Sequence, residues 1–309
     1  MNVTLLQMAL VMACGVVWQL FKPAGLTAEQ TRLVLTSVVY YVLLPALILD
    51  VLWTADIGVH SLQYTLLGIG SLIFCMLCIW AIGRLFKYSR QSLGAMLLAI
   101  FPNVTYLGLP VLEQTFGHWG RSVAIQIDLF ATSPFLFTIG LMVVSRYSSE
   151  VQTPSKSFLS YLNAPPFWAA GLAVILNING ISGADWLVGV LQKLAAAVIP
   201  LMLFSLGLSL NWRAMKLVNL PTVLWVTVVK MCLMPAFALL LATQLTLEND
   251  HKAAAILDLA MPSMILGIVF CDRFRLDTGL YAMTVTVTTA LSLLILPFWY
   301  EQLHCWQLL

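Results

Sequence analysis

The chain is a succession of apolar segments, each about 20 residues long, joined by short polar connections. A helix of roughly 20 apolar residues spans the ~30 Å hydrocarbon core of a membrane. Ten segments fit this length, with approximate ranges 3–21, 32–54, 62–83, 92–115, 121–145, 164–180, 186–210, 220–246, 252–272 and 278–300. Only 9% of the residues are charged, against about one quarter in soluble domains. We therefore expect an all-α polytopic membrane protein and exclude soluble enzymes, nucleic-acid binders and secreted disulfide modules.

The basic residues are unevenly distributed among the connections, which predicts an orientation. Cytoplasmic loops are enriched in Lys and Arg. The even-numbered connections carry only Arg121 and Lys252, whereas the odd-numbered ones carry Lys22, Arg32, Arg84, Lys87, Arg90, Arg146, Lys156, Arg213, Lys216, Arg273 and Arg275. The odd connections are therefore predicted to be cytoplasmic. Both termini then lie on the outer, periplasmic side of a plasma (inner) membrane, which requires an even number of spans and agrees with ten.

The two halves of the chain carry matching prolines. Pro45 corresponds to Pro200, and Pro102 corresponds to Pro262, at separations of 155 and 160 residues. This predicts a first five-helix repeat in residues 1–150, a linker at 151–163 and a second repeat in residues 164–309. Because each repeat has an odd number of spans, the second one would be inserted with inverted topology.

Prolines in the fourth and ninth segments predict broken helices, since proline removes a backbone donor and clashes with the preceding turn. Open backbone at membrane depth is tolerated only where protein or water satisfies it. Inverted repeats with helices broken at matching positions point to the site of a secondary transporter. The N-terminal ends of the second half-helices would favour an anion there. The alternative is a pair of simple proline kinks.

Several motifs resemble the auxin efflux carrier family, which includes bacterial malonate-type carboxylate carriers. The run Asn103–Pro110 is similar to its Asn-x-Gly-x-x-Gly-Leu-Pro crossover motif, and the stretches 197–210, 230–235 and 260–263 resemble its seventh, eighth and ninth helices. The resemblance implies a bile-acid-symporter-like fold. Segments 1, 2, 6 and 7 would form a scaffold, and segments 3–5 and 8–10 a transport domain with elevator-like motion. Thr105 and Gly267 depart from the family pattern, where glycine and proline are common.

The resemblance implies an efflux carrier or permease for a small organic anion such as malonate, malate or an auxin-like acid. The substrate-binding residues that it implies are Asn103, Thr105, Gly108, Pro110, Pro262, Ser263 and Gly267. Asn103 and Ser263 each directly follow a proline, so their short polar side chains either cap a broken helix or bind a carboxylate.

Three charged residues lie inside predicted spans: Lys230, Asp128 and Asp258. A charge near the bilayer centre costs at least ~2.5–3.5 kcal/mol on insertion scales, so each should face protein or a water-filled cavity. We expect Lys230 to pair with one of the two aspartates, either as a coupling element in place of a sodium ion or as a static ion pair. Glu113 either lines the outer side of the transport pathway or is an acidic residue that stabilises the first turn of a helix. Asp50 is expected to be interfacial.

Other chemistry has little support. Cys75 and Cys78 lack a second pair and are interpreted as small hydrophobic residues. The four histidines lie on the predicted outer side without ligand spacing, and no metal, cofactor or catalytic residue is expected. A sodium-coupled bile-acid-type symporter is the main alternative, ahead of an intramembrane enzyme or a channel. The expected partners are an organic anion and the lipid bilayer, without nucleic acid. Transport direction, protons as the coupling ion and a homodimer stay open.

Overall fold

The computed structural model describes residues 2–55, 58–148, 164–210, 216–306 and 308. Across these residues the secondary structure is helical, apart from one isolated antiparallel bridge between Pro102 and Ser263. Six helical stretches in the described chain are long and apolar enough to cross a membrane: Ala28–Leu52, Val59–Leu85, His118–Ser145, Asp185–Ser209, Leu217–Ala242 and Thr278–Cys305. The structure thus confirms a polytopic all-α membrane protein. The predicted linker 151–163 lies outside the described residues.

The other four predicted segments are also helical but shorter or interrupted. Helices α1 (Asn2–Phe21) and α11 (Pro165–Ile178) are single pieces. The fourth segment is divided into α5 (Arg90–Leu98) and α6 (Leu109–Phe116), and the ninth into α15 (Asn249–Leu259) and α16 (Gly267–Arg273). Both breaks occur where the prolines predict them. Membrane crossing by these four segments and the inverted repeat stay predictions.

Widened π-helical turns precede four prolines. They are η2 (Val39–Leu43), η3 (Val104–Gly108), η4 (Asp128–Thr132) and η8 (Val229–Leu233), and each ends two residues before Pro45, Pro110, Pro134 or Pro235. Proline has no N–H and its ring crowds the preceding turn, so the helix widens there instead of continuing regularly. Tyr40, Thr105, Asp128 and Lys230 all lie in these turns.

The π-helical turns join shorter α-helices into long stretches. Helix α2 (Ala28–Val38) continues through η2 into α3 (Leu44–Leu52). Helices α7 (His118–Ile127), α8 (Ser133–Phe135) and α9 (Leu141–Ser145) follow one another through η4 and η5 (Leu136–Gly140). Helices α13 (Leu220–Val228) and α14 (Met234–Ala242) flank η8. The long helices α4 (Val59–Leu85), α12 (Asp185–Ser209) and α17 (Thr278–Cys305) have no such turn.

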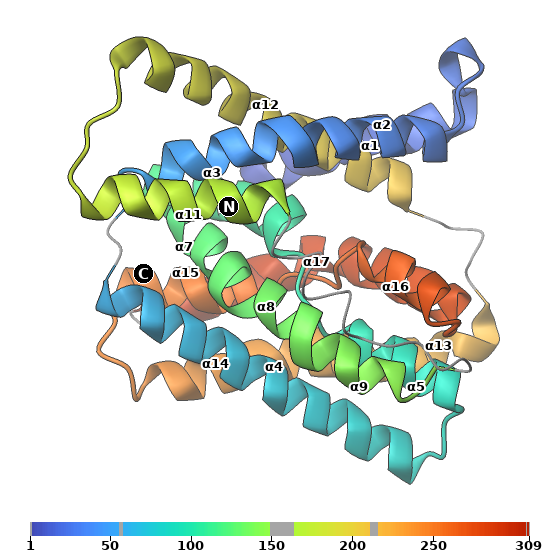
Figure 1. Ribbon diagram of the computed structural model, residues 1–309. Helices are drawn as coiled ribbons and strands as arrows, with labels where there is room; N and C mark the ends of the chain where they lie inside the picture. Colours follow the sequence, from blue (N-terminus) through green and yellow to red (C-terminus); the bar gives the residue numbers. More distant parts are fainter. Residues whose placement is uncertain (1, 56–57, 149–163, 211–215, 307, 309) are drawn as a thin grey trace.

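The helices form two groups (Figure 1). A first group contains α1, α2, α3, α11 and α12, and the other helices form a second group beside it. In the first group α1 and α12 approach so closely that a Cβ on Gly207 would lie 2.0 Å from the Met12 carbonyl oxygen. In the second group α4 packs on α14, where the rings of Phe74 and Phe237 stack at 4.1 Å. The division into a scaffold and a moving transport domain stays a prediction.

The two broken segments cross inside the second group and satisfy each other's backbone. The Asn103 N–H donates to the Pro262 carbonyl at 2.8 Å, and the Met264 N–H donates to the Phe101 carbonyl at 2.9 Å. The Ser263 hydroxyl donates to the carbonyl of Ala99, the residue that ends α5, at 2.6 Å. Helix ends leave unpaired carbonyls and N–H groups, and the partner segment supplies their hydrogen bonds here. The crossing therefore fixes irregular backbone in the protein interior.

Candidate functional site

A cavity of about 530 Å³ lies between the two helix groups at the crossing. Its first wall comes from α2, η2 and α3 with the start of α11. Its second wall comes from both broken segments and the η4 region. Most of the lining is apolar or aromatic, while the polar lining comprises Arg32, Thr36, Ser37, Tyr40, Asn103, Thr105, Tyr106, Asp128, Ser133 and Ser205. The volume falls in the range of about 300–1,000 Å³ typical of small-molecule sites.

Asn103 and Asp128 bring polar chemistry to the second wall of this cavity. The Asn103 side chain is 2% exposed, and its Nδ2 has no hydrogen-bond partner among the described residues. The Asp128 carboxylate accepts hydrogen bonds from Thr105 and, at 2.8 Å, from the Ser133 hydroxyl. The departure of Thr105 from glycine therefore has a structural consequence, because its hydroxyl orients the acid. A buried amide without a partner is costly, so a ligand that accepts from Asn103 would be stabilised.

The remaining predicted binding residues shape the crossing without lining the cavity. The Pro262 carbonyl and the Ser263 hydroxyl make backbone contacts across the crossing. Gly108 packs on Asp258, where a Cβ would meet Oδ1 at 2.2 Å, and Gly267 packs equally tightly on the Tyr281 ring. Pro110 is buried in the first turn of α6. The Ser263 hydroxyl thus caps the C-terminal end of α5, and its role in binding a carboxylate stays a prediction.

Lys230 and Asp258 are both fully buried, but no direct ion pair joins them. The Lys230 ammonium donates to the Leu259 carbonyl at 2.7 Å. Among the described residues neither Asp128 nor Asp258 has a carboxylate oxygen within 4.0 Å of Lys230 Nζ. Both Asp258 oxygens lack a hydrogen-bond partner in the described chain. The expected pairing of Lys230 with an aspartate is thus absent from this conformation, because the nearest peptide carbonyl takes the ammonium.

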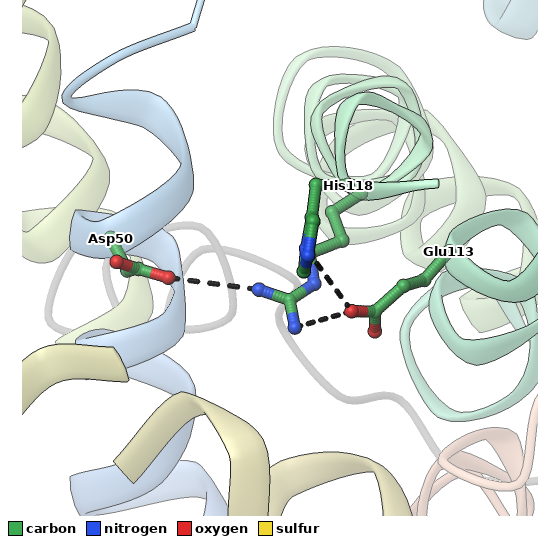
Figure 2. Close-up of polar contacts among 4 residues, drawn as sticks. Asp50, Glu113 and His118 are labelled. Atoms are coloured by element: carbon green, nitrogen blue, oxygen red, sulfur yellow. Dashed lines mark ion pairs between the residues drawn. The ribbon is translucent and has the colours of Figure 1, made fainter. Parts of the chain in front are cut away.

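A second cavity, of about 790 Å³, lies between the helix groups toward the predicted outer side. Arg121 of α7 crosses the gap, 3.6 Å from Asp50 of α3 and 2.5 Å from Glu113 of α6. Figure 2 shows the guanidinium between Asp50 and Glu113, with His118 close by and 3.5 Å from the Glu113 carboxylate. All three side chains of this Asp50–Arg121–Glu113 bridge are only 12–16% exposed. Asp50 is therefore an ion-pair partner and not merely interfacial. Glu113 lies past the first turn of α6 and pairs with Arg121, and its place on a transport pathway stays a prediction.

Sequence reasoning missed the bridge. It also missed the first wall of the 530 Å³ cavity at the crossing, which we call the inner cavity. The sequence places Arg121 only in an outer connection, and Arg32 contributes only to the orientation signal. Tyr40 of η2 lines the inner cavity together with Arg32. Arg121 is one of two basic residues in the even-numbered connections, and this unusual placement is the one sequence signal for it. The sequence does not show that Arg121 lies close to Asp50, which is 71 positions away.

The helices define a polytopic membrane protein with a cavity between two helix groups. Residues 2–300 match the family described as "Membrane transport protein", and the chain belongs to that family. This confirms the resemblance to the auxin efflux carrier family. Both the family and the relatives' names describe transporters and not enzymes.

The similar curated proteins are transporters of archaeal and bacterial origin. A protein of Methanothermobacter thermautotrophicus is 29% identical over 288 residues, covering 91% of this chain and 92% of that protein. A Methanocaldococcus jannaschii protein is 27% identical, covering 89% and 91% of the two chains. The Escherichia coli protein YfdV is 24% identical, covering 77% of each chain. All three are described as uncharacterized transporters.

Proposed function

We propose that this protein is a secondary active transporter of a small organic anion, a carboxylate such as malonate, malate or an auxin-like acid. It would work by alternating access, with the second helix group moving in an elevator-like manner against the first. The observation that carries the proposal is the crossing of two broken helices at a cavity whose walls come from both groups. A ligand held between two such groups changes its exposure when one group shifts. The predicted setting is the inner membrane, with ten spans and both termini outside.

The second wall favours an anion. The helical stretch that starts at Val104 lines the cavity with its first residues, Val104, Thr105 and Tyr106. The N-terminal end of a helix carries free N–H groups and a partial positive charge, which together stabilise negative groups. The unpartnered Asn103 amide adds a donor at the same place. A carboxylate is the small-molecule group that matches both.

The buried acids and Lys230 support coupling to protons. A buried carboxylate without donors is far more costly than its neutral form, and Asp258 has two such oxygens beside the crossing. Lys230 places a cation at the carbonyl of Leu259, the residue that follows Asp258. We infer that Asp258, Asp128 and Lys230 exchange a proton during transport, and that Lys230 takes the role of a sodium ion.

Uptake by purified protein in proteoliposomes tests the function. We expect uptake of a labelled carboxylate into wild-type vesicles that depends on an imposed proton gradient and is lost in Asn103→Ala. The alternative is a sodium-coupled bile-acid-type symporter, in which the two Asp258 oxygens that lack hydrogen-bond donors in the described chain would be sodium ligands. Replacing sodium by choline in the uptake buffer distinguishes it. Uptake that requires sodium and ignores the proton gradient would favour that alternative. Absence of carboxylate uptake under either gradient would overturn the proposed function.

A further inference from the structure

The inner cavity has one basic residue among its described lining residues, Arg32, and its charge is unpaired. Arg32 lies on α2, in the first helix group, and its side chain is only partly exposed. Within the described chain its guanidinium makes no hydrogen bond and no ion pair. Arginine presents five donors that match a carboxylate in a two-bond geometry. An unpaired guanidinium on the wall of a small-molecule cavity is therefore a ready anion site.

The acid in the same cavity does not neutralise Arg32. Asp128 is the acidic member of the described lining, and its carboxylate is engaged by the hydroxyls of Thr105 and Ser133 on its own wall. Arg32 faces the cavity from the opposite group of helices. The cavity thus holds a positive charge on the first wall that has no internal partner.

The second wall supplies an independent sign of a missing ligand. The Asn103 side chain is nine-tenths buried or more, lines the same cavity and leaves Nδ2 without an acceptor. A carboxylate is an acceptor for both groups. Because an unsatisfied buried donor is destabilising, a bound acceptor would satisfy the Asn103 amide at the crossing while it neutralises Arg32.

We propose that Arg32 is the cationic anchor of the substrate carboxylate, and that substrate joins Arg32 of the first helix group to Asn103 of the second. This inference rests on the proposed function and adds a specificity-determining residue to its site. Because the two residues belong to different groups, bound anion would link the groups in this conformation. Arg32 would then have to release the anion when the groups shift. Because its guanidinium is positively charged, Arg32 would also select substrates that carry a negative charge.

Binding measured as a dissociation constant on purified, detergent-solubilised protein tests the assignment. The probes are two matched pairs, indole-3-acetate with indole-3-acetamide and malonate with malonamide, in which the charge changes while the shape is kept. For wild type we expect at least one acid to bind about tenfold or more tightly than its amide, because a charged hydrogen-bonded pair contributes more than a neutral one. For Arg32→Gln we expect that preference to disappear, and for Arg32→Lys to persist in part.

Two control variants separate the inference from the proposed function. Arg84→Gln removes an exposed basic residue that stacks on Trp80 away from the cavity, so the preference should stay at the wild-type value. Asn103→Ala should weaken binding of the same acid.

The outcomes distinguish the two claims. If Asn103→Ala weakens binding of the acid and Arg32→Gln does not, the Arg32 assignment is wrong while the cavity remains the substrate site. This is also the result expected if Arg32 pairs with a lipid phosphate instead. If neither acid binds to wild type, the proposed function fails and the assignment fails with it.

Folding of the variants is checked separately. Melting temperatures of Arg32→Gln and Arg32→Lys without ligand should equal that of wild type, because the guanidinium has no partner in the described chain to lose. If Arg32→Gln does not fold, the comparison of Arg32→Lys with wild type decides alone. If Arg32→Lys then binds the acid with the wild-type dissociation constant and prefers it over the amide as strongly as wild type does, the two-bond anchor by Arg32 is wrong.

Discussion

The guanidinium of Arg121 lies 3.6 Å from the carboxylate of Asp50, and these two residues belong to different helix groups. Arg121 is on α7, beside the helix crossing, and Asp50 is near the end of α3. Glu113 holds the same guanidinium from α6. Charge pairs that are 12–16% exposed are screened weakly by solvent. The contact therefore connects the second helix group to the first on the predicted outer side, where the proposed alternating access would require a barrier that opens and closes.

Replacing Arg121 by Gln should destabilise this arrangement. The change leaves two largely buried carboxylates near one another without their cation, which costs about 3 kcal/mol at the lower end of the range for buried pairs. Thermal unfolding of the purified protein measures the effect. Asp50→Asn should cost less, since Arg121 keeps Glu113. Arg84→Gln, which loses only an exposed contact with Trp80, should cost less than about 1 kcal/mol. Equal melting temperatures for Arg121→Gln and Arg84→Gln would contradict a role for the bridge.

Gly108→Ala should disrupt the crossing. A Cβ at this position would lie 2.2 Å from Asp258 Oδ1, and overpacking of an interior typically costs about 1–3 kcal/mol. We expect a lower melting temperature together with reduced uptake. Gly189→Ala is the matched control, because a Cβ there meets nothing within 4 Å, and alanine is up to about 1 kcal/mol better than glycine in a helix. If Gly108→Ala and Gly189→Ala have the same melting temperature and the same uptake, the close packing of Gly108 is not needed for stability or transport.

Thr105→Val should impair transport while leaving the fold intact. Valine keeps the shape of threonine but removes the hydroxyl that donates to Asp128. Hydrogen bonds to charged groups contribute about 1.5–3 kcal/mol, so initial uptake rates should fall by roughly tenfold or more. Thr105→Ser retains the donor and should recover most of the rate. Initial rates normalised to reconstituted protein provide the comparison, and a Thr105→Val rate near that of wild type would count against the hydroxyl.

Lys230→Gln and Lys230→Ala should remove proton dependence. The ammonium is fully buried and held by the Leu259 carbonyl, so each change deletes a cation next to Asp258. We expect both variants to lose most pH-driven uptake. Glutamine, which keeps a donor for Leu259, should be closer to wild type in melting temperature than alanine. Undiminished, pH-dependent uptake by both variants would eliminate a coupling role for Lys230 and leave it as a structural residue.

The prolines made much of the fold predictable. Pro102 and Pro262 located both breaks, and the residues around them, Asn103 and Ser263, are the ones that meet at the crossing. Their effect is local, because proline removes a donor and crowds the turn before it wherever it occurs. Segment hydropathy predicts that Asp128, Asp258 and Lys230 lie inside spans, and the structure has Asp128 and Lys230 in stretches long and apolar enough to cross a membrane. Hydropathy did not predict that Lys230 would bond to a peptide carbonyl, since that depends on which backbone group lies nearest in three dimensions.

The sequence by itself determined that this chain is a membrane protein, which segments are helical and where two of them break, because length, hydropathy and proline act through neighbours along the chain. Only the tertiary structure decided which side chains share a space. It placed Arg32 with Asn103, Asp50 with Arg121, and Gly108 with Asp258. Such pairs come from helices far apart in sequence, and their distances are set by how the two groups pack. A local pattern carries no information about that packing.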